Sequence, residues 1–121
     1  MLTAEQLAEY RSGAQSREAA RKQESRSRRL RAWRAAHRGA SLLKGTFGAN
    51  RVIVFGSLAH GAWFGPRSDI DLAVEGLAGE GFGTAWTAVE RVASGFNVDL
   101  VDLAVAPERL RERIREYGRE L

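Results

Sequence analysis

Three consecutive segments decide the fold: VIVFGS (52–57), LAHGAWFGPRS (58–68) and DIDLAV (69–74). The first apolar run leads into a small, tight turn at Gly56 and Ser57, and the second apolar run begins with Asp69 and Asp71. Alternate side chains of a β-strand point to the same face, so these two aspartates are predicted to lie side by side. Two carboxylates on a largely buried strand are costly without a counter-charge. Oxygen-only ligands suit a divalent cation, above all Mg²⁺, which proteins usually share with substrate phosphates.

This pattern resembles the signature of the polymerase β-like nucleotidyltransferase superfamily, which is Gly-Ser, a spacer and then Asp-x-Asp. More narrowly, the chain resembles the minimal nucleotidyltransferases (MNT), the antitoxins of HEPN/MNT toxin–antitoxin pairs. The resemblance covers about residues 51–103 and is carried by FGS (55–57), HG (60–61), SDIDL (68–72) and VDLVD (98–102). The spacer is one residue longer than is usual in the family, and the extra residue falls near Gly65 and Pro66, a turn-prone pair at which insertions are tolerated.

The resemblance implies the nucleotidyltransferase fold and a reaction in which an acceptor oxygen attacks the α-phosphorus of ATP and pyrophosphate leaves. It assigns Asp69 and Asp71 as catalytic residues and as ligands of Mg²⁺, with a two-metal site as the expectation. Gly56 and Ser57 would bind the nucleotide, since a residue without Cβ lets the backbone approach the phosphates and the hydroxyl can donate to them. Such chemistry depends mainly on positioning and charge neutralisation.

A third carboxylate comes from a neighbouring strand in this superfamily, and the chain offers Asp99 and Asp102. The family pattern of one aspartate among apolar residues matches Asp99, which is therefore predicted to be the third catalytic residue and metal ligand. Asp102 lies three residues further on, so it would point to the opposite face of the strand and serve a structural or capping role.

Two basic residues of the spacer are candidates for nucleotide binding. His60 stands where relatives carry a basic residue near the nucleotide, and Arg67 is placed to reach a phosphate. Each of them fits an ordinary loop side chain equally well. Trp63 and Phe64 fit either stacking on a base, contact with a partner, or packing in the core.

Length and composition limit the classes of protein to which the chain can belong. A chain of 121 residues is expected to form one small domain with a single core. The absence of cysteine excludes disulfides and thiolate metal sites. Neither a signal peptide nor an apolar run long enough to span a membrane is evident, so a cytoplasmic protein without a membrane partner is predicted.

The net charge of +4 conceals an asymmetry between the two parts of the chain. Residues 1–51 contain twelve Lys or Arg and four Glu, whereas residues 52–121 contain seven Arg and eleven acids. A basic arm (1–45) thus precedes a mildly acidic minimal nucleotidyltransferase domain (46–121). The arm can be read as a solvated helix, or as a surface that docks an acidic partner, a second copy or, less favoured, nucleic acid.

Periodicity predicts a small mixed β-sheet with flanking helices, an α/β (α+β) fold. Thr3 and Gln6 form a predicted capping box for the arm, whose apolar spacing lapses between residues 15 and 29, so either one helix or two helices broken near residues 25–27 fit the pattern. The other predicted elements are strands at 51–55, 69–74 and 97–103, a glycine-rich turn after the first strand, and helices that begin at Thr84 and Pro107.

Three functions compete at this stage. The resemblance implies transfer of AMP from ATP to a hydroxyl, a tyrosine in this family, of a HEPN ribonuclease toxin that supplies the acceptor. A second function keeps the chemistry but uses a small molecule or an RNA end as acceptor. A third is a non-catalytic antitoxin or interaction module, against which the complete set of Gly-Ser, Asp-x-Asp and Asp99 argues.

Overall fold

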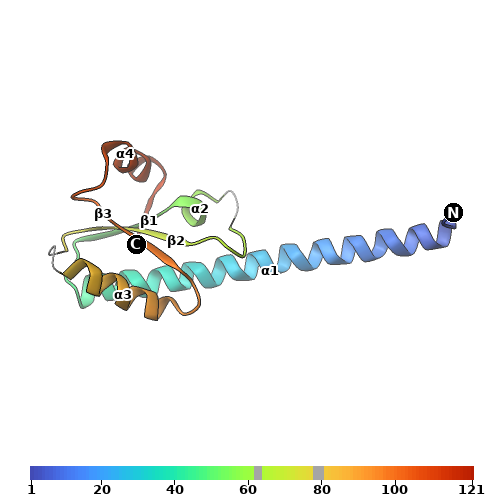
Figure 1. Cartoon of the computed structure of the whole chain (residues 1–121), viewed down its shortest axis with the longest axis horizontal. Helices are drawn as coiled ribbons and strands as arrows, with labels where there is room; N and C mark the ends of the chain where they lie inside the picture. Colours follow the sequence, from blue (N-terminus) through green and yellow to red (C-terminus); the bar gives the residue numbers. More distant parts are fainter. Residues whose placement is uncertain (62–63, 78–80) are drawn as a thin grey trace.

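The computed structural model of the chain describes residues 1–61, 64–77 and 81–121. Trp63, a stacking candidate in the sequence, lies outside these ranges. The elements in chain order are α1 (Ala4–Gly45), β1 (Arg51–Phe55), α2 (Gly56–His60), β2 (Ile70–Glu75), α3 (Phe82–Ala93), β3 (Val98–Asp102), α4 (Glu108–Tyr117) and β4 (Arg119–Glu120). The predicted mixed sheet with flanking helices and a long N-terminal helix is confirmed (Figure 1). No helix in the described ranges is both long and apolar enough to cross a membrane.

The four strands form one sheet in the order β3-β2-β1-β4. β1 pairs antiparallel with β2 and with β4, whereas β2 and β3 are parallel because α3 carries the chain back between them. The indole nitrogen of Trp86 on α3 donates a 2.7 Å hydrogen bond to the carbonyl oxygen of Val98, which fixes α3 against β3.

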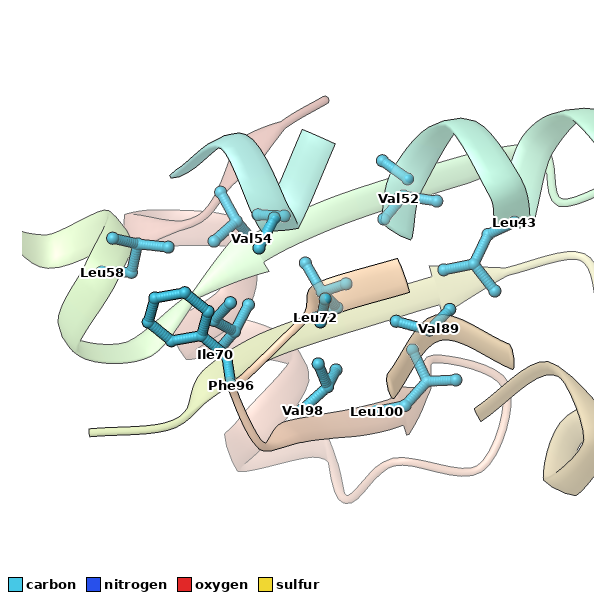
Figure 2. Packing of buried hydrophobic residues seen from close by; sticks show 14 of the residues in the cluster. Leu43, Val52, Val54, Leu58, Ile70, Leu72, Val89, Phe96, Val98 and Leu100 are labelled. Atoms are coloured by element: carbon cyan, nitrogen blue, oxygen red, sulfur yellow. The ribbon is translucent and has the colours of Figure 1, made fainter. Parts of the chain in front are cut away.

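The sheet has a covered face and a more open face (Figure 1). α1 and α3 pack on the covered face, where the main core forms; Figure 2 shows Leu43, Leu72, Val89 and Leu100 converging there from α1, β2, α3 and β3. α4 lies on the opposite face, where a smaller cluster consists of Ile53, Ala73 and Ile114. α2 follows the end of β1 and contributes its buried Leu58 and Ala59 to the main core. Strand side chains alternate between the faces, so one set of strand residues builds the core while the other set faces α4.

The arm is one continuous helix rather than two, which resolves the alternative left open by the sequence. Thr3 and Gln6 form the predicted capping box: the Gln6 amide donates to the Thr3 hydroxyl at 3.1 Å, and the Thr3 amide donates to the Gln6 side chain at 2.8 Å. Residues near the middle lack an apolar stripe but form ion pairs one turn apart, from Glu18 to Arg21 and Lys22.

The second half of α1 packs on the sheet through small residues. Its buried residues are Ala32, Ala35, Ala36, Gly39, Ala40 and Leu43. A Cβ on Gly39 would stand 3.1 Å from a Val89 methyl, so the helix lies close to α3. The first half of the helix projects beyond the sheet (Figure 1). The predicted division into an arm (1–45) and a domain (46–121) stays a prediction.

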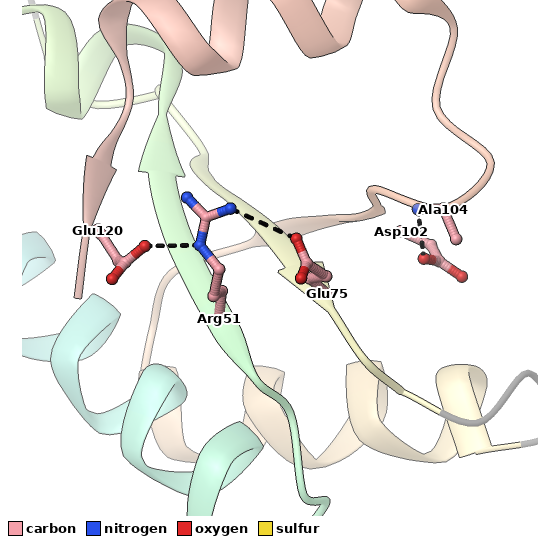
Figure 3. Close-up of polar contacts among 5 residues, drawn as sticks. All are labelled: Arg51, Glu75, Asp102, Ala104 and Glu120. Atoms are coloured by element: carbon pink, nitrogen blue, oxygen red, sulfur yellow. Dashed lines mark hydrogen bonds and ion pairs between the residues drawn. The ribbon is translucent and has the colours of Figure 1, made fainter.

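The turn after β1 and two of the strands differ from the sequence predictions. The glycine-rich turn after β1 is the single-turn helix α2, and β2 begins at Ile70, one residue later than predicted. β4 was not predicted, because two charged residues carry no strand periodicity. It is held at the sheet edge by the Leu121 amide, which donates to Val52 at 2.9 Å, and by Arg51, which bonds Glu120 and Glu75 across three strands (Figure 3).

Candidate active site

The carboxylates meet on the open face of the sheet. Phe55, Asp71 and Asp99 occupy one row across β1, β2 and β3, since Phe55 is opposite Asp71 and Asp71 is beside Asp99. Residues of the neighbouring rows, Ile70 and Leu72, are fully buried on the covered face. Alternation therefore places Asp71 and Asp99 on the face that carries α4. Asp69 is exposed and directly precedes β2, where the Ile70 amide donates to Asn97 at 2.9 Å.

Gly56 is in direct contact with the carboxylate of Asp71. Its backbone has a φ of 69°, a conformation that residues with a side chain rarely adopt. A Cβ at this position would overlap the Asp71 Oδ2 atom. The glycine thus allows the start of α2 to lie against the aspartate, and it places Ser57 one residue further along the same turn.

The three aspartates are electrostatically coupled. Burial of the Asp71 carboxyl, followed by the negative charges of Asp99 and Asp69, raises the pKa of Asp71 to about 6. A carboxyl whose pKa is raised in this way favours a proton or another cation near pH 6. The predicted proximity of Asp69, Asp71 and Asp99 is consistent with this coupling.

The donor chemistry of this cluster fits a divalent cation. All three side chains present carboxylate oxygens, the ligands of Mg²⁺, and the Asp71 carboxylate lies directly against the backbone of Gly56 at the start of α2. Within residues 1–61, 64–77 and 81–121, no three His, Asp or Glu side chains lie close enough together to form a preformed metal site. Like charges repel, so we expect the carboxylates to converge only with a cation between them.

Asp102 has the structural role predicted for it. Its Oδ1 atom accepts a 3.0 Å hydrogen bond from the Ala104 amide and so caps the turn that follows β3 (Figure 3). Asp99 and Asp102 therefore differ in position: Asp99 continues the carboxylate row, and Asp102 ends the strand.

A cleft of about 490 Å³ opens beside the Gly-Ser turn, between α2 and α4. It is lined by Phe55, Gly56, Ser57, His60, Leu110, Arg113 and Tyr117. The ring centroids of His60 and Tyr117 lie 5.3 Å apart, so the two rings are in contact at the cleft. Arg113 brings a positive charge to it, whereas Arg111 and Arg115 on the same helix pair with Glu108. The cleft therefore combines aromatic rings, a cation and a glycine turn.

The sequence predicted one side of this cleft and missed the other. Gly56, Ser57 and His60 all line it, as expected for nucleotide-binding candidates. Arg67 does not line it: it is exposed in the turn from Gly65 to Ser68. The sequence around Arg113 does not indicate a binding role, because Arg113 reaches the cleft only where α4 packs beside α2.

The comparison with protein families agrees with this geometry. The family described as polymerase beta, nucleotidyltransferase matches residues 40–121, about two thirds of the chain. The chain belongs to this family. It is accordingly a nucleotidyltransferase, as the Gly-Ser and Asp-x-Asp pattern predicted. No curated protein sequence matches it.

Solved toxin–antitoxin structures are similar to this nucleotidyltransferase. One, with AMP-PNP, is 26% identical with a TM-score of 0.60 and covers 70% of each chain. A re-refined structure of a tri-AMPylated Shewanella oneidensis HEPN toxin with its MNT antitoxin is 22% identical, with a TM-score of 0.56 over 74% of this chain and 70% of that chain. A variant of the MntA–HpeT toxin–antitoxin is 22% identical, with a TM-score of 0.60 over 70% of each chain. The predicted resemblance to the minimal nucleotidyltransferases is confirmed.

Proposed function

We propose that this nucleotidyltransferase transfers AMP from ATP to a tyrosine hydroxyl of a HEPN ribonuclease and so acts as its antitoxin in the cytoplasm. The observation that carries the proposal is the contact of Gly56, which lines the cleft, with the Asp71 carboxylate, which lies beside Asp99 in the sheet. The similar structure with AMP-PNP supports an adenine nucleotide as substrate. The tri-AMPylated toxin of the Shewanella complex supports a protein acceptor.

Asp69, Asp71 and Asp99 are the residues that would hold Mg²⁺. When bound, the cation would neutralise phosphate charge and favour ionisation of the attacking hydroxyl. The raised pKa of Asp71 agrees with this assignment: burial of the carboxyl is its main cause, and the negative charges of Asp99 and Asp69 add an uncompensated excess. Binding of a cation would remove that excess.

The reaction forms one bond and breaks one bond at the α-phosphorus. The acceptor oxygen attacks this phosphorus, the bond to the bridging oxygen of the β-phosphate breaks, and pyrophosphate leaves with the electron pair. Asp99 is exposed, unlike the half-buried Asp71, and is the carboxylate we assign to accept the hydroxyl proton. Ser57 and the start of α2 would donate hydrogen bonds to the phosphates.

The cleft between α2 and α4 is the place we assign to the nucleotide. The Arg113 guanidinium is suited to phosphate oxygens, since it offers several donors in a fixed plane. The His60 and Tyr117 rings provide an aromatic surface for a base. Arg67, exposed on its turn, stays a candidate for phosphate contact only if the spacer moves when substrate binds.

The test supplies ATP labelled at the α-phosphate, with Mg²⁺, to four samples of the purified protein. They contain the protein alone, the protein with the product of the adjacent gene, which we expect to be the HEPN protein, the protein with RNA, and the protein with small hydroxylated acceptors. The Asp69→Asn/Asp71→Asn double variant is the inactive comparison. Asp102→Asn is the matched control, because it removes a nearby carboxylate that caps a turn instead of facing the site.

Label on the HEPN protein with the wild type and with Asp102→Asn, and none with the double variant, would support the proposal. Label on RNA or on a small molecule alone would instead establish the second function considered from the sequence. A stable complex with the HEPN protein, without transfer by any form, would identify a binding-only antitoxin.

A further inference from the structure

α1 packs against the sheet and also forms hydrogen bonds to the segment that connects the two halves of the catalytic motif. The segment that matches the nucleotidyltransferase family begins at residue 40, so most of α1 precedes it. Two consecutive arginines of this earlier part, Arg28 and Arg29, nevertheless bond to the spacer between the Gly-Ser turn and Asp-x-Asp. The spacer is the segment by which the two halves of the catalytic motif are connected.

Arg29 binds the beginning of the spacer. Its guanidinium donates a 3.2 Å hydrogen bond to the carbonyl oxygen of Leu58, the residue after Ser57. α2 has only five residues and ends at the left-handed Gly61, so its last carbonyls have few partners inside the helix. The same guanidinium lies 3.4 Å from where a Cβ of Gly61 would stand. Arg29 thus supplies a positive charge where the helix dipole is negative.

Arg28 binds the end of the spacer. Its Nε donates a 2.9 Å hydrogen bond to the carbonyl oxygen of Gly65, and its guanidinium lies 5.6 Å and 4.7 Å from the ring centroids of Phe64 and Phe96. Gly65 opens the turn that Ser68 closes: the Ser68 amide donates to the Gly65 carbonyl at 3.1 Å, and the Gly65 amide donates to the Ser68 hydroxyl at 2.9 Å. Asp69 follows this turn immediately.

The two contacts therefore fix both ends of one catalytic loop from one rigid helix. Hydrogen bonds with a charged donor are among the stronger ones in proteins, and both arginines are half-buried, where water competes less. A shift of about 1 Å in a catalytic group can reduce a rate by about a hundredfold. The relative placement of Ser57 and Asp69 is thus sensitive to the position of α1.

We propose that Arg28 and Arg29 of α1 are positioning residues of the nucleotidyltransferase: they hold the spacer so that Ser57 and Asp69 face the same nucleotide. The loss of nucleotide transfer expected on their removal rests on the function proposed above, whereas the hold on the spacer does not. Anything that displaces α1 would, on this account, lower the rate.

The experiment compares Arg28→Gln, Arg29→Gln and Arg29→Lys in the full chain. Arg31→Gln is the matched control, because Arg31 is exposed on the same helix and pairs with Glu24 at 3.1 Å. Hydrogen–deuterium exchange is measured in peptides that cover residues 56–61 and 64–70. The affinity for ATP with Mg²⁺ and the rate of transfer to the HEPN protein are measured on the same samples.

Arg28→Gln and Arg29→Gln are expected to exchange faster in these peptides and to lower the turnover of nucleotide transfer by about tenfold to a hundredfold. Arg29→Lys should recover most of the loss, since an ammonium still reaches a single carbonyl. Arg31→Gln should match the wild type. Exchange equal to the wild type in both Gln variants would overturn the proposal. Faster exchange with unchanged ATP affinity and turnover would do so too, because the contacts would then be structural only.

The outcomes also separate this inference from the function proposed above. If the wild type transfers nothing to the HEPN protein, the proposed antitoxin reaction fails. The inference is then judged by exchange and ATP affinity: faster exchange with weaker ATP binding in both Gln variants supports it, and unchanged ATP binding overturns it.

Discussion

Asp71 and Gly56 are in a contact that a side chain on residue 56 would prevent. The carboxylate occupies the space of a Cβ at Gly56, whose φ of 69° itself disfavours a side chain. Two independent constraints therefore require glycine here, one steric and one conformational. The consequence is that a phosphate-binding turn and a carboxylate cluster are built as one unit.

Gly56→Ala is expected to reduce nucleotide transfer by about a hundredfold or more, since the added methyl displaces either Asp71 or the start of α2. The left-handed backbone adds a cost of about 1–2 kcal/mol to folding. Transfer rates and thermal unfolding measure the two effects. Gly45→Ala is the control, because a Cβ there meets no atom within 4 Å. Transfer by Gly56→Ala at the wild-type rate would refute the steric argument.

The raised pKa of Asp71 predicts a pH dependence of stability in the metal-free protein. The folded protein binds this proton more tightly than the unfolded chain, for which the ordinary value is 3.8, against about 6 in the folded state. Stability should therefore fall as the pH rises from about 4 to about 6 and then level off, by at most about 3 kcal/mol. Asp71→Asn should flatten this slope in unfolding experiments with EDTA. An identical slope in both proteins would show that folding does not raise the pKa of Asp71.

Mg²⁺ with ATP should stabilise the wild type, because ligands that bind only the folded state raise its stability. At a concentration one hundred times the dissociation constant the gain is about 2.7 kcal/mol, enough to move the unfolding midpoint by several degrees. Asp71→Asn should lose this shift, whereas Asp102→Asn should keep it. Equal shifts in the two variants would place the cation elsewhere.

Arg113→Gln should weaken ATP binding by about tenfold and affect AMP much less, since the guanidinium is assigned to the phosphates that AMP lacks. Calorimetric titration with AMP-PNP and with AMP measures the difference. Arg109→Gln, an exposed position on the same helix, should behave as the wild type. Equal losses for the two nucleotides would assign Arg113 to the nucleoside or to the α-phosphate.

The parts of the fold that depend on local sequence were predictable. Strand periodicity located β1, and it located β2 and β3 to within a residue at each end. The pairing of Asp71 with Asp99 was expected from the family resemblance, since periodicity does not give the order of the strands. The parts that depend on contacts between segments far apart in the sequence could not be predicted. Arg113 reaches the cleft only because α4 folds back over α2, and two charged residues gave no sign of β4.

The arginines of α1 show the same limit. In sequence Arg28 and Arg29 are indistinguishable from the exposed Arg26 and Arg31, since each is one of several arginines on a polar helix. Only the position of α1 against the spacer shows which of them bond to carbonyl oxygens. A basic stretch that suggested a docking surface thus proves to be partly internal structure.

We expect the cluster of Asp69, Asp71 and Asp99 to transfer AMP to a HEPN protein. The intact mass of that protein after coexpression, followed by location of the modified residue, measures this transfer. Added AMP groups on tyrosine are expected with the wild type, and none with Asp69→Asn/Asp71→Asn at equal expression. An unmodified HEPN protein bound to the wild type, or modification that persists with the double variant, would contradict it.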